Sequence, residues 1–399
     1  MFNTKCNVPE AEIRNRIGRL QSALQSRQVD AALILQNTDL YYFSGTIQQS
    51  HLYVPAQGKP LLMARKSLAR ARAESPIEQI VPLTSPKQIP GLLKDRGLPM
   101  PQRLGMELDV LPVNLFRIYE LVFEGPDMMD VSTDIRMIRA IKSEYEIAAV
   151  EKAAERSDQV AAHVKEIIKP DMTELELAGL AEAHARKLGH QGIIRMRLFG
   201  GELFYGHLLC GASAAVPSYL ASPTGGSAAN PAVAQGAGFA RIRRNEPILL
   251  DFAFALDGYI SDHTRIFALG GLPDALMAAH EAMLHIQNDI KSMAVPGVPA
   301  GRLYDRGVKL AAEAGYGDHF MGAEASRIKF IGHGVGLELD EYPFLAKGQE
   351  MPLAENMVIA LEPKLIFPGT GVVGIENTHV VTPEGLRQLG RYPDTITIV

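Results

Sequence analysis

The chain is poor in features that mark several large classes of protein. Its 399 residues include only two cysteines, Cys6 and Cys210, too far apart in sequence for a disulfide framework or a zinc-finger spacing. No apolar run approaches the roughly 18 residues of a membrane span. The first residues, MFNTKCNVPEAEIRN, contain no apolar core of a signal peptide. These absences predict a cytoplasmic protein with no membrane partner. Within the apolar segment LLCGAS, Cys210 is predicted to be a buried small residue, with a reactive thiol as the alternative.

A long basic run is also missing. The formal net charge is -5, which argues against nucleic acid or an anionic membrane surface as the main partner. With 47% hydrophobic and 21% charged residues, the composition is that of an ordinary globular protein. The length predicts two or three domains, and an enzyme of the cytoplasm fits these bounds best.

Short helix and strand signals alternate over the first part of the chain. Apolar residues recur at helical spacing within residues 10–28, and residues 29–35 form an apolar run typical of a buried strand. Turn-prone residues 37–39 end that strand, and a hairpin is predicted across residues 51–63. This alternation predicts a separate α/β domain over residues 1–135.

Residues 136–399 are predicted to form an α+β domain of helices packed on antiparallel strands. A long helix is expected over residues 144–169, and a capping box at Thr173 opens the next helix. Residues 193–215 have a strand-like composition, and a loop rich in glycine, serine and alanine follows. Further helices are predicted over residues 273–293 and 302–314, and strands over most of residues 329–399.

A hairpin with two buried carboxylates stands out in the second domain. The turn at residues 257–258, Asp-Gly, is one of the strongest short hairpin signals. It pairs Asp262 with Ala253 and leaves Asp251 diagonal to Asp262 on the same face. Two buried carboxylates repel each other, so a cation is expected between them. The alternative is a pair of ordinary hairpin aspartates, one of them paired with Arg265.

Three more polar residues lie inside apolar segments. His333 stands between glycines in the sequence FIGHGVG, where open backbone suits close approach of a ligand, although an ordinary core or loop histidine would have the same pattern. Glu362 ends the buried strand MVIALEP, and Glu376 follows VVGI. A three-residue loop at residues 368–370 would place Glu362 directly opposite Glu376. A second hairpin is therefore predicted to present two carboxylates.

Four carboxylates and one imidazole are more charge than a core tolerates unpaired. The set suits two divalent cations bridged by carboxylates, and its oxygen-rich ligands favour manganese, cobalt, iron or zinc. A pair of such ions lowers the pKa of a bridging water and stabilises a tetrahedral intermediate. The predicted metal ligands are Asp251, Asp262, His333, Glu362 and Glu376.

Several motifs now resemble one known superfamily. DFAFALDGYISDHTR, GHGVGLELDEYP, ALEP and GIENTHVV are similar, in order and spacing, to motifs of the methionine aminopeptidase, prolidase and creatinase "pita-bread" superfamily. The segment RIGRLQSALQSRQVDAALILQNTDLYYFSGT resembles the smaller N-terminal domain of prolidases, Xaa-Pro aminopeptidases and creatinases. The resemblance implies an α+β pita-bread domain preceded by a smaller α/β domain of the creatinase/prolidase type.

The resemblance also implies a role for each member of the ligand set. Asp251 would bind one metal ion, and Asp262 and Glu376 would bridge both. His333 and Glu362 would bind the second ion, and Glu362 holds the position usually given the acid/base role. The implied cofactors are two divalent ions, manganese in the first place, with cobalt, zinc or iron as alternatives.

The chain departs from the pattern of these peptidases at substrate-side positions. A second histidine usually follows the GHG motif, where this chain has Asp340, and another precedes the first aspartate, where Ser218 stands. His207 could supply an imidazole from a neighbouring strand, although a structural histidine fits the same pattern. Asp340 could accept a cationic group of the substrate or simply face solvent. Lys364 replaces a common glycine and adds positive charge beside the site.

The resemblance implies a dinuclear-metal hydrolase that cleaves the bond before proline in small peptides. A water held between Asp262 and Glu376 would be the nucleophile and Glu362 its general base. A hydrolase or lyase of a small non-peptide substrate is the enzymatic alternative, and a non-catalytic binding module is the other. The family resemblance further implies a homodimer.

Overall fold

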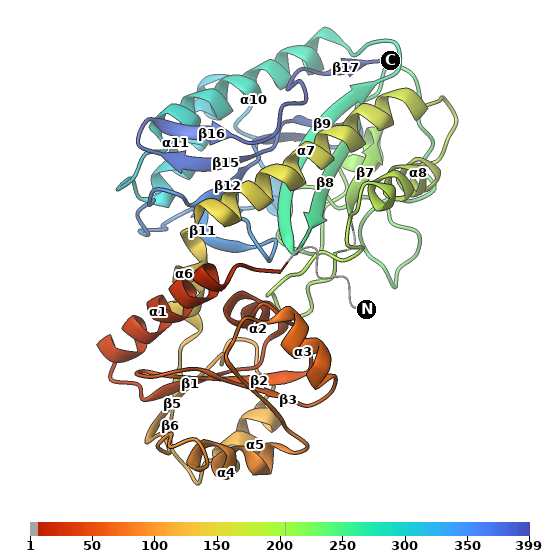
Figure 1. Cartoon of the computed structure of the whole chain (residues 1–399). Coiled ribbons are helices and arrows are strands. Elements are labelled where there is room, and N and C mark those ends of the chain that lie inside the picture. The colour runs from red at the N-terminus through yellow and green to blue at the C-terminus, as the bar shows by residue number, and fades with distance from the viewer. Residues whose placement is uncertain (1–6, 204) are drawn as a thin grey trace. The chain divides into compact units, whose positions relative to one another are not determined.

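The structure is a computed structural model that describes residues 7–203 and 205–399, so Cys6 lies outside the described residues (Figure 1). The chain forms two compact units, Met1–Arg139 and Ala140–Val399. The predicted boundary after residue 135 falls inside helix α6 (Ser132–Ala140). Among the described helices, none combines the length and apolarity needed to cross a membrane.

The N-terminal unit is a six-stranded mixed sheet with helices on both faces, as the alternating sequence pattern predicts. Its strands lie in the order β4 (Gln79–Pro82), β3 (Leu61–Ala64), β2 (Ser50–Pro55), β1 (Ala31–Ile34), β5 (Arg103–Met106) and β6 (Asp127–Asp130). Figure 1 shows α1 (Glu10–Ser26), α2 (Asn37–Ser44) and α3 (Leu68–Glu74) on one face and α4 (Ile89–Lys94) and α5 (Val113–Val122) on the other.

The start of α2 differs from the sequence prediction. Residues 37–39 were expected to form a turn, and they open a helix instead. The side chain of Gln36 caps this helix by accepting a hydrogen bond from the backbone N–H of Asp39, and the buried Asp39 carboxylate pairs with Arg139 at 2.7 Å. Asn, Thr and Asp favour helix N-termini as much as turns, so the local sequence alone could not separate the two. The predicted hairpin of residues 51–63 is confirmed as β2 and β3.

The C-terminal unit contains two larger, mainly antiparallel sheets. One has the order β17 (Thr397–Ile398), β9 (Tyr259–Ala268), β8 (Ile248–Leu256) and β7 (Gly206–Cys210). The other has the order β11 (Glu341–Ala346), β10 (Phe330–Gly334), β12 (Val358–Leu361), β15 (Asn377–Thr382) and β16 (Gly385–Gln388). A separate hairpin joins β13 (Lys364–Phe367) to β14 (Gly371–Gly374).

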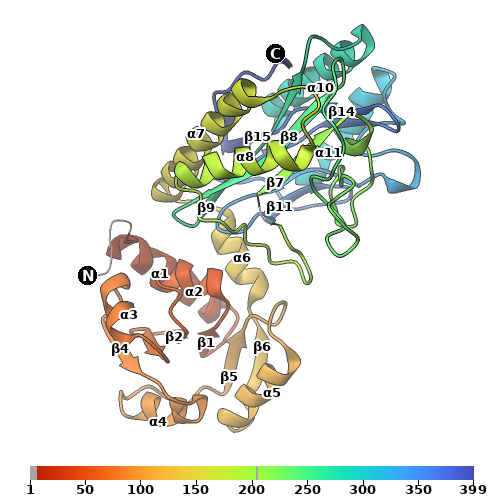
Figure 2. The ribbon, with the colours of Figure 1, turned by 90° about the vertical axis from the view of Figure 1, so that its right-hand side faces the viewer.

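Two pairs of helices cover these sheets and complete an α+β unit. Helices α7 (Glu144–Ile167) and α8 (Glu174–Lys187) pack on the sheet of β7, β8 and β9 (Figure 2). Helices α10 (Asp274–Met293) and α11 (Ala300–Glu313) pack together, α10 against β16 and α11 against β10 and β11. The predicted capping box is confirmed, because the hydroxyl of Thr173 accepts from the N–H of Glu176 at 3.1 Å and Glu176 bonds back to Thr173.

The strand predicted over residues 193–215 is mostly wrong. Among the described residues of this segment only β7 is a strand, and residues 211–214 form the short helix α9 (Gly211–Ala214). Strand β7 pairs with β8 from Gly206 onward, and a Cβ at Gly206 would meet the carbonyl oxygen of Asp251 at 2.2 Å. Apolar composition alone does not make a strand where no neighbouring strand is in reach. Cys210 is buried, as predicted.

Candidate metal centre

The first carboxylate hairpin has the predicted register. Strands β8 and β9 turn at residues 257–258, both with positive φ, and Ala253 lies opposite Asp262. This conformation is the one that Asp-Gly favours in a two-residue hairpin loop. Asp251 and Asp262 therefore lie on the same face of the sheet. Arg265, the alternative partner of these aspartates, pairs instead with Asp394 at 3.2 Å.

The second carboxylate pair lies at a break in a long hairpin. Leu361 pairs with Asn377 at the end of one ladder, and Lys364 pairs with Gly374 at the start of the next, in the same register. Glu362 and Glu376 lie between the two ladders and opposite each other, as predicted. The backbone carbonyl of Glu376 accepts a hydrogen bond from the N–H of Thr264 on β9 at 3.2 Å. The second hairpin is thereby joined to the first at the carboxylates.

His333 reaches the same place from β10. A Cβ at Gly332 would meet the carbonyl oxygen of Ala360 at 2.3 Å, and one at Gly334 would meet that of Tyr342 at 2.1 Å. Glycines on both sides of His333 therefore let neighbouring strands approach closely. The Nδ1 of His333 lies 3.1 Å from the carbonyl oxygen of Gly334. Because a carbonyl only accepts, Nδ1 carries a proton, and it is Nε2 that would serve as the ligand atom once the ring is neutral.

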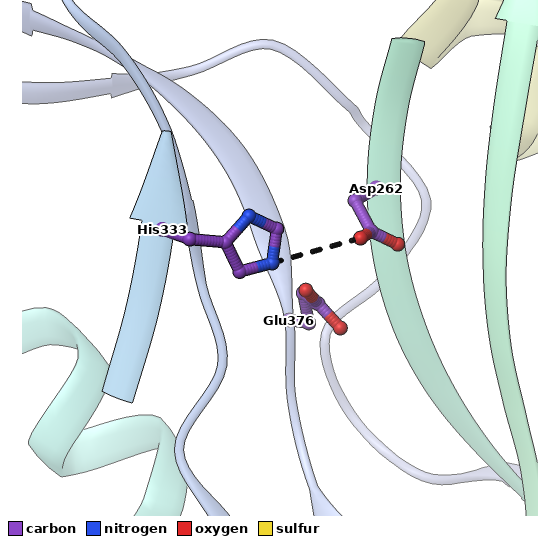
Figure 3. Close-up of side chains that lie close together, drawn as sticks. All are labelled: Asp262, His333 and Glu376. Carbon is purple, nitrogen blue, oxygen red and sulfur yellow. Dashed lines mark ion pairs between the residues drawn. The ribbon is translucent and has the colours of Figure 1, made fainter. Parts of the chain in front are cut away.

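Three of the predicted ligands form a group of the size that holds a metal ion. The ligand atoms of Asp262, His333 and Glu376 all lie within 4.8 Å of one another, and all three side chains are buried. Figure 3 shows them converging, with the His333 Nε2 3.9 Å from Asp262 Oδ2. Glu362 Oε1 lies 3.8 Å from the same nitrogen. One imidazole and two or three carboxylates suit a divalent ion such as manganese, iron, cobalt or zinc.

The remaining carboxylates contact a lysine. The Nζ of Lys364 lies 2.8 Å from Glu362 Oε2, 2.9 Å from Glu376 Oε2 and 3.0 Å from Asp251 Oδ2. Lys364 is completely buried. Positive charge beside the site could be predicted from the sequence, but its position between three of the predicted metal ligands could not. The five predicted ligands therefore surround two cation positions, one of which holds the Lys364 ammonium.

The charged groups of this cluster shift one another's pKa values. Burial raises the pKa of Asp262, and the nearby carboxylate of Asp251 raises it further. Burial, followed by repulsion from Asp262, also raises the pKa of Glu376. Burial alone would lower the pKa of His333, but Asp340 and neighbouring carboxylates raise it to about 9. The cluster thus favours bound positive charge, which is the property a cation site requires.

Two threonines, neither predicted from the sequence, support the ligands. The hydroxyl of Thr264 donates to Glu376 Oε2 at 2.8 Å, and that of Thr378 accepts from the backbone N–H of Asp262 at 2.9 Å. Their alternation with the ligands along β9 and β15 is the signal that could have found them, since residues two apart on a strand share a face. The Thr264 contact fixes the orientation of the Glu376 carboxylate, and the Thr378 contact fixes the backbone that carries Asp262.

The substrate-side candidates have different surroundings. His207 is buried on β7 directly opposite Asp251, and among the described residues its Nε2 has no hydrogen-bond partner. Burial lowers the pKa of His207, so the ring is neutral. Asp340 lies 3.8 Å from the Nδ1 of His333 and is partly exposed. Ser218 contacts Gln235 at 3.4 Å.

The family of the chain follows from the comparison with known proteins. Residues 148–383 match Metallopeptidase family M24, and residues 16–141 match the Creatinase/Prolidase N-terminal domain. The chain belongs to metallopeptidase family M24. It is therefore a peptidase with a pita-bread C-terminal unit and a creatinase/prolidase-type N-terminal unit, as the resemblance implied.

Relatives of this M24 peptidase span nearly its whole length. The Xaa-Pro dipeptidase of Pyrococcus horikoshii is 27% identical over 379 residues, covering 94% of this chain and 97% of the relative. That of Pyrococcus furiosus is 28% identical over 383 residues, with 94% and 98% coverage. The solved prolidase from Pyrococcus horikoshii OT3 superposes with a TM-score of 0.79 at 26% identity, covering 95% of this chain and 99% of that one.

Proposed function

We propose that this M24 peptidase hydrolyses the bond before proline in small peptides at the centre formed by Asp262, His333 and Glu376. The observation that carries the metal dependence is the buried convergence of these three ligands. The substrate class is supported by the similarity to Xaa-Pro dipeptidases. Manganese as the preferred ion, a homodimeric assembly and a cytoplasmic location are further parts of the proposal and rest on the family resemblance.

A divalent ion at this centre would supply Lewis-acid chemistry, polarising a carbonyl oxygen and making water more acidic. Glu362 is placed to accept a proton, because Lys364 holds its Oε2 at 2.8 Å and leaves Oε1 facing His333 at 3.8 Å. A general base needs this fixed orientation within reach of the attacking water. The role proposed for Glu362 is therefore the acid/base one.

The substrate contacts are assigned to His207 and Asp340. His207 is neutral, lies beside Asp251 and has Nε2 available among the described residues, so it can hydrogen-bond to a bound peptide. Asp340 is partly exposed next to His333 and can accept the ammonium of an amino terminus. A small non-peptide substrate is the second candidate, because Asp340 and Ser218 replace the two histidines that the peptidase pattern leads us to expect.

The test measures free proline released from a panel of Xaa-Pro dipeptides by metal-loaded protein. We expect turnover by the wild type and its loss in Asp262→Asn, which also loses the ion. Asp289→Asn is the matched control. Asp289 lies on α10, pairs with Arg306 of α11 at 2.7 Å and takes no part in the centre. Full metal loading without turnover across the panel would contradict the peptide substrate and favour the non-peptide candidate.

A further inference from the structure

We infer that the ammonium of Lys364 takes the place of one of the two metal ions expected from the family resemblance, so that each chain binds a single divalent ion. The inference deepens the proposed function, on whose metal centre it rests. It concerns the position surrounded by Asp251, Glu362 and Glu376, which differs from the group formed by Asp262, His333 and Glu376.

The contact geometry of Lys364 places its ammonium at a cation position. Its Nζ lies between 2.8 and 3.0 Å from one oxygen of each of Asp251, Glu362 and Glu376. A lysine ammonium has three N–H donors, and these three contacts use all of them. A transition-metal ion bound to the same oxygens would lie about 2.0–2.2 Å from each. The nitrogen and such an ion would therefore overlap, so this position cannot hold a metal while the ammonium occupies it.

The backbone around Lys364 packs closely against this side chain. The backbone carbonyl of Lys364 accepts a hydrogen bond from the N–H of Met321 at 3.0 Å. Gly374 lies opposite on β14, and a Cβ there would meet the Lys364 Cα at 2.6 Å and Cγ at 3.0 Å. The missing side chain of Gly374 thus makes room for the lysine stem. Because Lys364 is fully buried, the ammonium cannot reach solvent while the hairpin is intact.

The oxygens of Glu362 and Glu376 are divided between Lys364 and the metal position. Glu362 gives Oε2 to Lys364 and turns Oε1 toward His333, 3.8 Å away. The Oε2 of Glu376 accepts from both Lys364 and Thr264, which leaves its other oxygen for the ion. Glu376 is therefore shared between the ammonium and the metal position, and Glu362 keeps Oε1 beside that position, where the family resemblance implies two metal ions.

The charges of the cluster also favour one ammonium and one divalent ion. The cluster holds the carboxylates of Asp251, Asp262, Glu362 and Glu376, or four negative charges when ionised. The ammonium and one divalent ion supply three positive charges, which nearly neutralises them. A second divalent ion beside the ammonium would make the buried cluster positive and repel Lys364. One ion per chain is the arrangement that these residues favour.

The experiment counts bound ions in the purified full chain after removal of metal and reloading with manganese. We expect one ion in the wild type, one in Lys364→Arg and two in Lys364→Met, in which the three carboxylates lose their cation. Lys142→Met is the matched control, because Lys142 is equally buried against Glu341 at 2.9 Å and its loss should leave the count at one. Equal counts in the wild type and Lys364→Met would overturn the inference.

A diffraction measurement keeps the test independent of how well the variants fold. Wild-type crystals soaked in manganese should show one anomalous peak, near Asp262, His333 and Glu376. A second peak between Asp251, Glu362 and Glu376 would overturn the inference whatever the variants do. The gain of an ion in Lys364→Met tests the lysine, whereas turnover of Xaa-Pro peptides by the wild type tests the proposed function, so the two can fail separately.

Discussion

Replacing Lys364 with methionine should destabilise the metal-free protein by about 3–5 kcal/mol, the usual cost of removing one partner from a buried ion pair. The structure places this lysine against three carboxylates at 2.8, 2.9 and 3.0 Å. Hydrogen bonds to charged groups contribute roughly 1.5–3 kcal/mol each, so three of them sum to about 4.5–9 kcal/mol, which reaches or exceeds the expected loss. Protonation of the abandoned carboxylates relieves part of the repulsion and brings the loss down to the stated range.

The assay is urea unfolding in the presence of a chelator, followed by the same titration with excess manganese. The ion should restore about 2.7 kcal/mol to Lys364→Met at a concentration 100 times its dissociation constant, beyond any effect on the wild type. Lys142→Met should also be destabilised but should gain no more from manganese than the wild type. A loss below about 1 kcal/mol would refute the buried placement of Lys364, because a buried unpaired charge costs more.

Three further predictions test other parts of the structure. Asp262→Asn should lower kcat/KM for a cleaved Xaa-Pro dipeptide at least 100-fold, roughly the loss expected when one charge-stabilising group leaves an active site, with the steady-state rate as the readout. Burial lowers the pKa of His51 to about 4, and Arg65 adds to the shift. The folded state thus prefers neutral His51, and stability present above pH 6.5 should fall by about 3 kcal/mol as the pH drops toward 4; His51→Gln should flatten this slope in denaturant titrations, and an unchanged slope would contradict the assignment. Thr173→Ala removes the hydroxyl of a complete capping box and should lower the free energy of unfolding by about 1 kcal/mol, whereas an unchanged urea midpoint would show that the cap contributes nothing.

Much of the centre could be predicted because turns determine register. The Asp-Gly turn at residues 257–258 fixes the pairing of Asp262 with Ala253, and the loop at residues 368–370 fixes that of Glu362 with Glu376. Both pairs follow from the two-residue period of a strand once the turn is known. The carboxylate faces were therefore accessible from the sequence alone.

The position of Lys364 between the carboxylates was not predicted, although the sequence contains a signal for it. Lys364 follows Glu362 by two residues, so the strand period places both on the same face. What the sequence does not show is the space opposite Gly374 and the approach of Asp251 from another sheet. Residues 193–203 follow an irregular path, although local composition assigned them to a strand.

The proposal that one divalent ion per chain supports peptide hydrolysis is tested most directly by titrating manganese into metal-free protein. Bound ions and proline release are followed together. Activity should rise with the first ion and reach its plateau at one ion per chain, when the position between Asp262, His333 and Glu376 is filled. Activity that reaches its plateau only at two ions per chain, or full activity without any ion, would contradict the proposal.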